Sequence, residues 1–160
     1  MDTNQLETGL DAFVATLEAG GFAPAAGTAE WGAEHAAAHV IAANRSFTAL
    51  AADLLAGGRP SYDNRPTTER THLEAIVAAA ASWEGLLAEL RRSVAELVAV
   101  AGRTDEEAAA RPVPFVIRDG GAVVASGDGS LADLVNGHGT FHLDRHRRQL
   151  EELRAGVASG

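Results

Sequence analysis

The 160-residue sequence contains no cysteine, no lysine and few aromatic residues. Without cysteine the chain cannot form a disulfide, bind a metal through thiolates or use a cysteine nucleophile. It also lacks an apolar run of about 18 residues, which a membrane-spanning helix requires. The N-terminal segment MDTNQLETGLDAF is acidic, whereas a signal peptide begins with a basic segment. These absences predict a cytoplasmic protein that does not enter a membrane.

The net charge of the chain bears on the kinds of molecule that it can bind. The formal net charge is −9, and all 13 basic residues are arginines. Because the recognition of phosphates requires a basic face, this excess of acid argues against a nucleic-acid partner. The length is typical of one hydrophobic core, so we expect residues 1–160 to form a single domain.

Apolar residues recur at spacings of three and four along four long segments, which predicts four helices. Alanine, the best helix former, is frequent in them. The first helix should stop at Gly20-Gly21, and the second, with Thr28 as its N-cap, before Gly57-Gly58. The four predicted helices cover roughly residues 2–19, 31–56, 68–101 and 130 to the C-terminal tail, the last capped by Ser130.

Between the third and fourth predicted helices the pattern changes. Residues 112–126 read PVPFVIRDGGAVVAS, two β-branched runs around a turn at residues 119–121, which is typical of a β-hairpin. Before them, residues 104–107 have the pattern of a capping box and predict a short helical turn. The sequence therefore predicts an all-α bundle with a small β-hairpin before the last helix.

Three of the six histidines lie on one face of the last predicted helix. At about 100° per residue, His138, His142 and His146 fall together with Gln149 on the stripe that faces the core. Burying an unpaired polar side chain costs about 2–7 kcal/mol relative to an apolar reference, so these ring nitrogens require partners. Because two imidazoles at i and i+4 project side by side, they can share one divalent cation.

A further ligand is expected from the second helix, where His39 lies about 80° from the centre of the apolar stripe and His35 about 120° from it. We therefore prefer His39 as the inward residue and treat His35 and His72 as non-ligands. The segment HAAAH is not the HExxH of zinc proteases, because Ala36 follows His35. His138 is either a fourth ligand or a partner of one. The alternative is that no metal binds and that water and side chains satisfy the histidines.

The segments TAEWGAEHAAAHVIAANRSF and FHLDRHRRQLEEL resemble those of the DinB/YfiT-like superfamily, which includes mycothiol-dependent maleylpyruvate isomerases and bacillithiol transferases. The resemblance covers nearly the whole chain. It implies a four-helix bundle with up-down-down-up connections and a Zn²⁺ or Ni²⁺ ion held by His39, His142 and His146. The predicted hairpin is not general in such proteins, and some relatives have glutamate in place of the first histidine of the late pair. Homodimers are common among them.

Three neutral imidazoles leave coordination positions open, which is the arrangement of a catalytic metal. We therefore expect a metal-dependent enzyme, either a thiol S-transferase or a hydrolase; the alternative is a non-catalytic binding protein of the same fold. Because the chain has no cysteine, a transferase of this kind requires an external low-molecular-weight thiol, of the mycothiol type, and a small electrophile. No catalytic residue is assigned.

Several other residues are candidates to shape or line the site. Arg45 and Arg145 are candidates to bind an anionic substrate, and Gln149 either orients a ligand or packs. Tyr62 and Asp63 lie in a loop that can overhang the site. Gly137 and Gly139 cost about 1 kcal/mol each inside a helix relative to alanine, which suggests close packing at both positions.

Overall fold

The computed structural model describes residues 1–23 and 31–158, with side chains up to residue 154, and is mostly helical with one small sheet. The helices are α1 (Asn4–Glu18), α2 (Ala33–Leu55), α3 (Arg65–Thr68), α4 (Arg70–Ala80), α5 (Trp83–Arg103), α6 (Glu106–Ala109), α7 (Leu131–Gly137) and α8 (Leu143–Ala158), with a π-helical turn η1 (His138–His142) between the last two. The strands are β1 (Tyr62–Asp63), β2 (Pro112–Asp119) and β3 (Ala122–Ser130).

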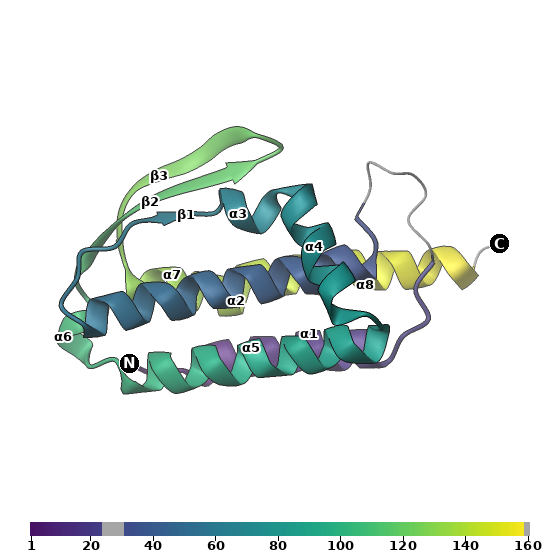
Figure 1. Cartoon of the computed structure of the whole chain (residues 1–160), viewed down its shortest axis with the longest axis horizontal. Helices are drawn as coiled ribbons and strands as arrows, with labels where there is room; N and C mark the ends of the chain where they lie inside the picture. Colours follow the sequence, from purple (N-terminus) through teal and green to yellow (C-terminus); the bar gives the residue numbers. More distant parts are fainter. Residues whose placement is uncertain (24–30, 159–160) are drawn as a thin grey trace.

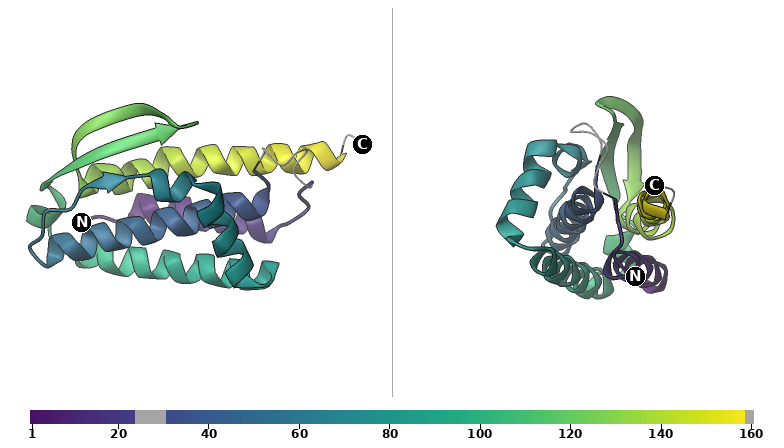
Figure 2. Two further views of the ribbon diagram at one scale, coloured as in Figure 1. Left: turned by 45° about the horizontal axis from the view of Figure 1, so that its top comes forward. Right: turned by 90° about the vertical axis from the view of Figure 1, so that its right-hand side faces the viewer.

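The long helices lie side by side, as the end-on view in Figure 2 shows, and enclose the core. Helix α2 packs extensively against α5, while α1 packs against α8 and η1. Most residues of α2 are buried, many of them alanines, whose small side chains let neighbouring helices approach closely. The core-facing stripe of α1 follows the predicted spacing, with its buried residues at Leu6, Leu10, Phe13 and Leu17.

The prediction of one continuous helix over residues 68–101 was wrong, because the chain breaks into α4 and α5. Ala81 adopts a left-handed conformation with φ of 62°, and the Ser82 hydroxyl accepts a hydrogen bond from the backbone N–H of Gly85. This N-cap starts a new helix in a new direction (Figure 1). A Cβ atom on Gly85 would lie 2.1 Å from the carbonyl oxygen of Ala80, so the break requires glycine there.

The hairpin was predicted correctly in place, but it is longer and belongs to a three-stranded sheet. Strand β2 pairs antiparallel with β3, and the two-residue strand β1 pairs in parallel with β2. Tyr62 is therefore not in an overhanging loop but in β1, where it is buried. The Asn64 side chain extends this pairing, because it donates to the carbonyl of Arg118 and accepts from the N–H of Arg118.

The last predicted helix begins at the predicted cap, where Ser130 and Asp133 form a capping box. It is not uniformly α-helical, however, since η1 interrupts it at the histidines; π-helical turns are frequent at functional sites. Gly139 lets this turn contact α1, because a Cβ atom there would lie 2.7 Å from the Cα of Leu6. The matching expectation for Gly137 was wrong, since a Cβ there would meet nothing within 4 Å.

Two predicted helix starts differ in detail. Thr28 lies outside the described residues, and α2 begins at Ala33 with Gly32 as its N-cap. The predicted turn near residue 104 is α6, but its N-cap is Asp105, while the Thr104 hydroxyl donates to the carbonyl of Val100. Within the part of the chain that the structure describes, no helix combines the length and apolar character needed to cross a membrane.

Candidate metal centre

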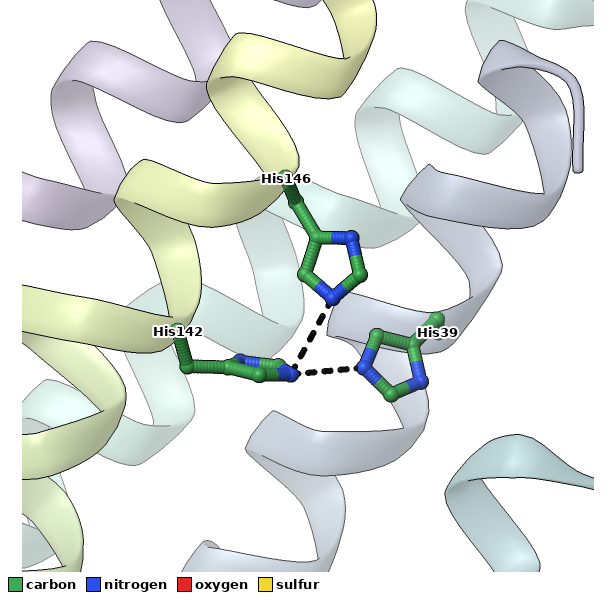
Figure 3. A group of neighbouring side chains, drawn as sticks. All are labelled: His39, His142 and His146. Carbon is green, nitrogen blue, oxygen red and sulfur yellow. Dashed lines mark hydrogen bonds between the residues drawn. The ribbon is translucent and has the colours of Figure 1, made fainter. Parts of the chain in front are cut away.

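His39, His142 and His146 converge on one point between α2 and the last helix (Figure 3). The Nε2 atom of His142 lies 2.7 Å from Nε2 of His39 and 3.2 Å from Nε2 of His146. His39 and His146 are 4% and 8% exposed, and His142 is partly buried. The three side chains predicted from the sequence are thus brought together by elements about a hundred residues apart.

The protonation of His39 is set by the chain beside it. Its Nδ1 atom lies 2.5 Å from the carbonyl oxygen of Thr67, which can only accept a hydrogen bond. The ring must therefore carry its proton on Nδ1, which leaves a lone pair on Nε2. The hydroxyl of Thr67 in turn donates to the carbonyl of Asn64, the N-cap residue of α3.

The protonation of His142 is set through a relay of buried polar groups. The Ser93 hydroxyl donates to the carbonyl of Leu90 and accepts from the amide nitrogen of Asn44. The Asn44 amide oxygen therefore faces Nε2 of His138, 2.9 Å away, and accepts its proton. Nδ1 of His138 is then an acceptor for Nδ1–H of His142, at 2.9 Å. His142 consequently also presents a lone pair on Nε2.

His146 completes the set. Its Nδ1 atom lies 3.0 Å from Oε1 of Gln149, an acceptor, so this ring also carries its proton on Nδ1 and a lone pair on Nε2. Of the two roles expected for Gln149, orienting a histidine is the one that the structure supports. In all three rings the nitrogen remote from the shared point makes the hydrogen bond, the pattern by which proteins orient metal-bound histidines.

Three lone pairs therefore face one another with no proton between them, which is unfavourable unless a cation occupies the point. Protonation of one of the three rings does not easily provide this positive charge. Burial lowers the pKa of His39 to about 4 and that of His138 to about 3, and it also lowers the pKa values of His142 and His146. Neutral imidazole nitrogens are ligands that divalent transition metals prefer. The donor set thus fits a divalent metal ion.

The remaining histidines have other places. His138 is buried and hydrogen-bonded to a histidine of the candidate site, so it acts as a partner of His142 and not as a fourth member of the group. His35 is half-buried near the start of α2, where its ring nitrogens have no hydrogen-bond partner among the described residues. His72 is exposed on α4. Neither of these two belongs to the three-histidine group, as expected.

A cavity of about 830 Å³, here called the outer cavity, opens onto the three histidines. Trp31 lies against them, its ring centroid 5.1 Å from that of His39 and 6.3 Å from that of His146. The hairpin forms the opposite wall, and its Asp119 pairs with Arg145 of α8 at 3.3 Å. Arg145 thus lines the cavity, whereas Arg45 pairs with Glu89 of α5 and does not; that Arg145 binds an anionic substrate stays a prediction.

The sequence did not reveal the groups that orient the three histidines: Thr67, Asn44 and Ser93. Only Asn44 carried a usable signal, because it is a lone amide within the alanine-rich, apolar stretch of the second helix. It is fully buried. The Thr67 contribution is a backbone carbonyl, which any residue type could supply.

The sequence profile of the mycothiol maleylpyruvate isomerase N-terminal domain matches residues 3–127. The match covers most of the chain and includes His39 and Asn44, whereas His142 and His146 follow its end. Searches among curated proteins and among solved structures returned no match.

Proposed function

The chain belongs to the family of mycothiol maleylpyruvate isomerase N-terminal domains, a DinB/YfiT-like family, and on this premise we propose that it binds a divalent metal and acts as a thiol S-transferase. The observation that carries the proposal is the convergence of three Nε2 lone pairs, each fixed by a hydrogen bond on the opposite side of its ring. His39, His142 and His146 are the proposed ligands, and Zn²⁺ or Ni²⁺ the proposed ion.

When bound, such an ion acts as a Lewis acid and lowers the pKa of a thiol or water that enters its open coordination position. The chain has no cysteine, so the thiol is a separate low-molecular-weight molecule, of the mycothiol type. The outer cavity, at about 830 Å³, is within the usual range for pockets that hold small molecules.

The charge of the outer cavity supports a thiolate. Arg118, Arg145 and Arg148 line it together with Asp119 and Glu152, so basic side chains outnumber acidic ones there, although the whole chain is strongly acidic. After burial, the positive charge of Arg145 is a further cause of the lowered pKa values of His39 and His142. The same field stabilises a negative sulfur near these rings.

We also infer that the long helices form the up-down-down-up bundle of DinB-like proteins. The course of the chain supports this arrangement: in Figure 1, α1 and α7–α8 run from left to right, while α2 and α5 run from right to left. The connection from α2 to α5 then contains β1, α3 and α4, and α3 brings the Thr67 carbonyl to His39.

The test is metal analysis of protein purified without a histidine tag and supplied with zinc or nickel. We expect about one equivalent of bound metal per chain, as for a single three-histidine site. His39→Ala should lose the metal, whereas His35→Ala, one turn earlier on the same helix, should keep it. Equal retention in the two variants, or no bound metal in the unaltered protein, contradicts the proposal.

Activity is tested with the zinc-loaded protein, mycothiol and a panel of electrophiles, by following the loss of free thiol. We expect conjugation that His142→Ala abolishes and His72→Ala leaves unchanged. Hydrolysis of an ester or amide panel without thiol consumption would instead identify a hydrolase, the other chemistry that an open three-histidine site can perform.

A further inference from the structure

A second, smaller cavity reaches two of the three histidines, His39 and His142. It measures about 240 Å³, and its lining residues come from α2, β1, α3, β2, α7 and η1. We call it the inner cavity. It shares His39, His142, Asn64 and Ile117 with the outer cavity, so His39 and His142 stand at the boundary between the two.

The walls of the inner cavity are mainly apolar, and they include Ala43, Phe47, Ile117 and Leu134. The Phe47 ring stacks on Tyr62 with a centroid separation of 4.8 Å, which gives one wall a flat aromatic surface. No arginine lines this cavity, in contrast to the outer one. Such walls favour an uncharged, apolar group over an anion.

The acidic side chain at this cavity is already engaged. Asp133 belongs to the capping box of α7, in which its carboxylate accepts from the backbone and hydroxyl of Ser130. It is therefore not free to bind a cationic ligand without giving up the helix cap. The polar groups that remain for a ligand are few, which suits a molecule with a single polar atom.

The Tyr62 hydroxyl is the polar group without a partner. Tyr62 is 7% exposed as a whole residue, and among the described residues its hydroxyl forms no hydrogen bond. The hydroxyl oxygen is not one of the fully enclosed polar atoms that lack a partner, so it remains accessible at the edge of the buried ring. A tyrosine with a buried ring and an accessible hydroxyl offers a ligand an apolar surface and one hydrogen-bond donor. Burial, followed by the charge of Asp63, raises the pKa of this phenol, so the group stays neutral and available as a donor.

We propose that the inner cavity binds the electrophilic substrate, a small uncharged carbonyl compound whose ring or chain packs on Phe47 and whose oxygen accepts a hydrogen bond from Tyr62. A dry cavity of about 150 Å³ holds benzene, so one of about 240 Å³ has room for a ring with a short substituent. The role of this molecule as substrate rests on the proposed function; its binding does not, because the cavity is formed by side chains alone. The thiol then occupies the outer cavity, across the three-histidine group.

The test uses acetophenone, which combines a phenyl ring with one carbonyl, and ethylbenzene, which lacks the acceptor. Each is titrated into metal-free and zinc-loaded protein and followed by calorimetry or by amide NMR shifts. We expect saturable binding of acetophenone in both forms. Tyr62→Phe should lower the affinity for acetophenone by about 3- to 10-fold, the effect of one net hydrogen bond, and leave the affinity for ethylbenzene unchanged.

A second variant tests the location. Leu134→Phe places a larger ring in the inner cavity and should remove the binding of both probes, while Leu55→Phe, the same change at an exposed residue of α2, should not. Thermal unfolding of both variants establishes that they are folded. No binding by the unaltered protein, binding that survives Leu134→Phe, or equal loss of both probes in Tyr62→Phe overturns the inference.

The metal content of the same samples separates this inference from the proposed function. Zinc binding without acetophenone binding refutes the inner-cavity inference and leaves the metal site standing. Acetophenone binding without zinc binding refutes the proposed metal site and leaves the inner-cavity inference standing.

Discussion

At the scale of the residue, the candidate site depends on groups that never touch the shared point. Thr67, His138 and Gln149 each fix the proton of one histidine on Nδ1, and Asn44 fixes that of His138. If one of these acceptors is lost, the corresponding ring can turn or change tautomer, and its Nε2 lone pair no longer points to the point that the three rings share. Partners of this kind affect metal affinity although they bind no metal.

The relay gives the first prediction. Asn44→Ala should weaken zinc binding by about 10- to 100-fold, the usual effect of removing a partner of a metal ligand, because His138 then loses the acceptor that fixes its protonation. The measurement is a competition titration with a chromophoric chelator at fixed pH. Ser46→Ala, on the same helix, is the control, since its hydroxyl bonds only to the carbonyl of Ala42.

If Asn44→Ala and Ser46→Ala bind zinc equally well, the relay does not orient His142. A general loss of structure is separated from the specific effect by comparing the unfolding midpoints of the two metal-free variants.

Sequence reasoning reached the three histidines because helical projection is sensitive to which face a side chain occupies. His39 was preferred to His35 for that reason, and the two are indeed 4% exposed and half-buried. Helical projection does not predict which residues of a neighbouring helix contact that face. The pairing of Asn44 with Ser93 joins positions 49 residues apart on different helices, and only the packing of α2 on α5 brings them together.

At the scale of the element, the π-helical turn packs directly on the backbone of α1, because both elements have glycine at the contact. A Cβ on Gly9 would lie 2.1 Å from the carbonyl oxygen of Gly139, and one on Gly139 would meet the backbone of Leu6. His138 and His142 are the first and last residues of this turn. The contact between α1 and η1 therefore helps to fix where these two rings lie in the core.

Two glycines two residues apart give a prediction with opposite signs. Gly139→Ala should lower the free energy of unfolding by about 1–3 kcal/mol, because backbone atoms of α1 must move. Gly137→Ala should raise it by about 0.5–1 kcal/mol, since its φ of −59° is helical and its Cβ would meet nothing within 4 Å. Urea unfolding of the two variants measures both; equal effects would show that the close contact with α1 is absent.

The capping box of α7 gives a prediction about pH. Hydrogen bonds from Ser130 lower the pKa of Asp133, so folding is favoured by the ionised form. This contribution is present above the ordinary aspartate pKa of about 3.9 and is lost as the pH falls through the lowered value in the folded protein.

Asp133→Asn should therefore be less stable than the unaltered protein at pH 7, and the difference should shrink as the pH falls below about 4. Asp128→Asn, at an exposed residue of β3, provides the control. Urea unfolding at several pH values measures the difference. A difference that stays constant with pH would mean that the carboxylate does not stabilise the cap.

The elements were predictable where local signals decide and not where tertiary contacts do. The Ser130 cap and the hairpin turn are encoded by a few adjacent residues. The break between α4 and α5 had the signals Ser82 and Gly85, but both lie within an apolar pattern that continues through it. Strand β1 has only two residues and forms because β2 lies beside it, so no local pattern marks it.

At the scale of the whole molecule, the candidate ion joins parts of the chain that are far apart. His39 and His142 are separated by 103 positions, and only the first of them lies in the region matched by the family profile. A ligand that binds the folded state and not the unfolded state adds its binding free energy to stability. The ion should therefore stabilise the docking of the last helix on α2.

Metal removal tests this coupling. Zinc at 100 times its dissociation constant should raise the free energy of unfolding by about 2.7 kcal/mol, and a chelator should reverse the gain. His146→Ala should show no such response, while His35→Ala should respond like the unaltered protein. Thermal unfolding with and without zinc measures the effect; a zinc response that persists in His146→Ala would place the ion elsewhere.

The central claim is that Nε2 of His39, His142 and His146 bind one metal ion. Anomalous diffraction from crystals grown with zinc tests it most directly, because it locates the ion relative to each ring. The account predicts one peak about 2.0–2.1 Å from all three Nε2 atoms, with the Nδ1 atoms still bonded to Thr67, His138 and Gln149. A peak bound instead by His138 or His35, or no peak between α2 and the last helix, would contradict it.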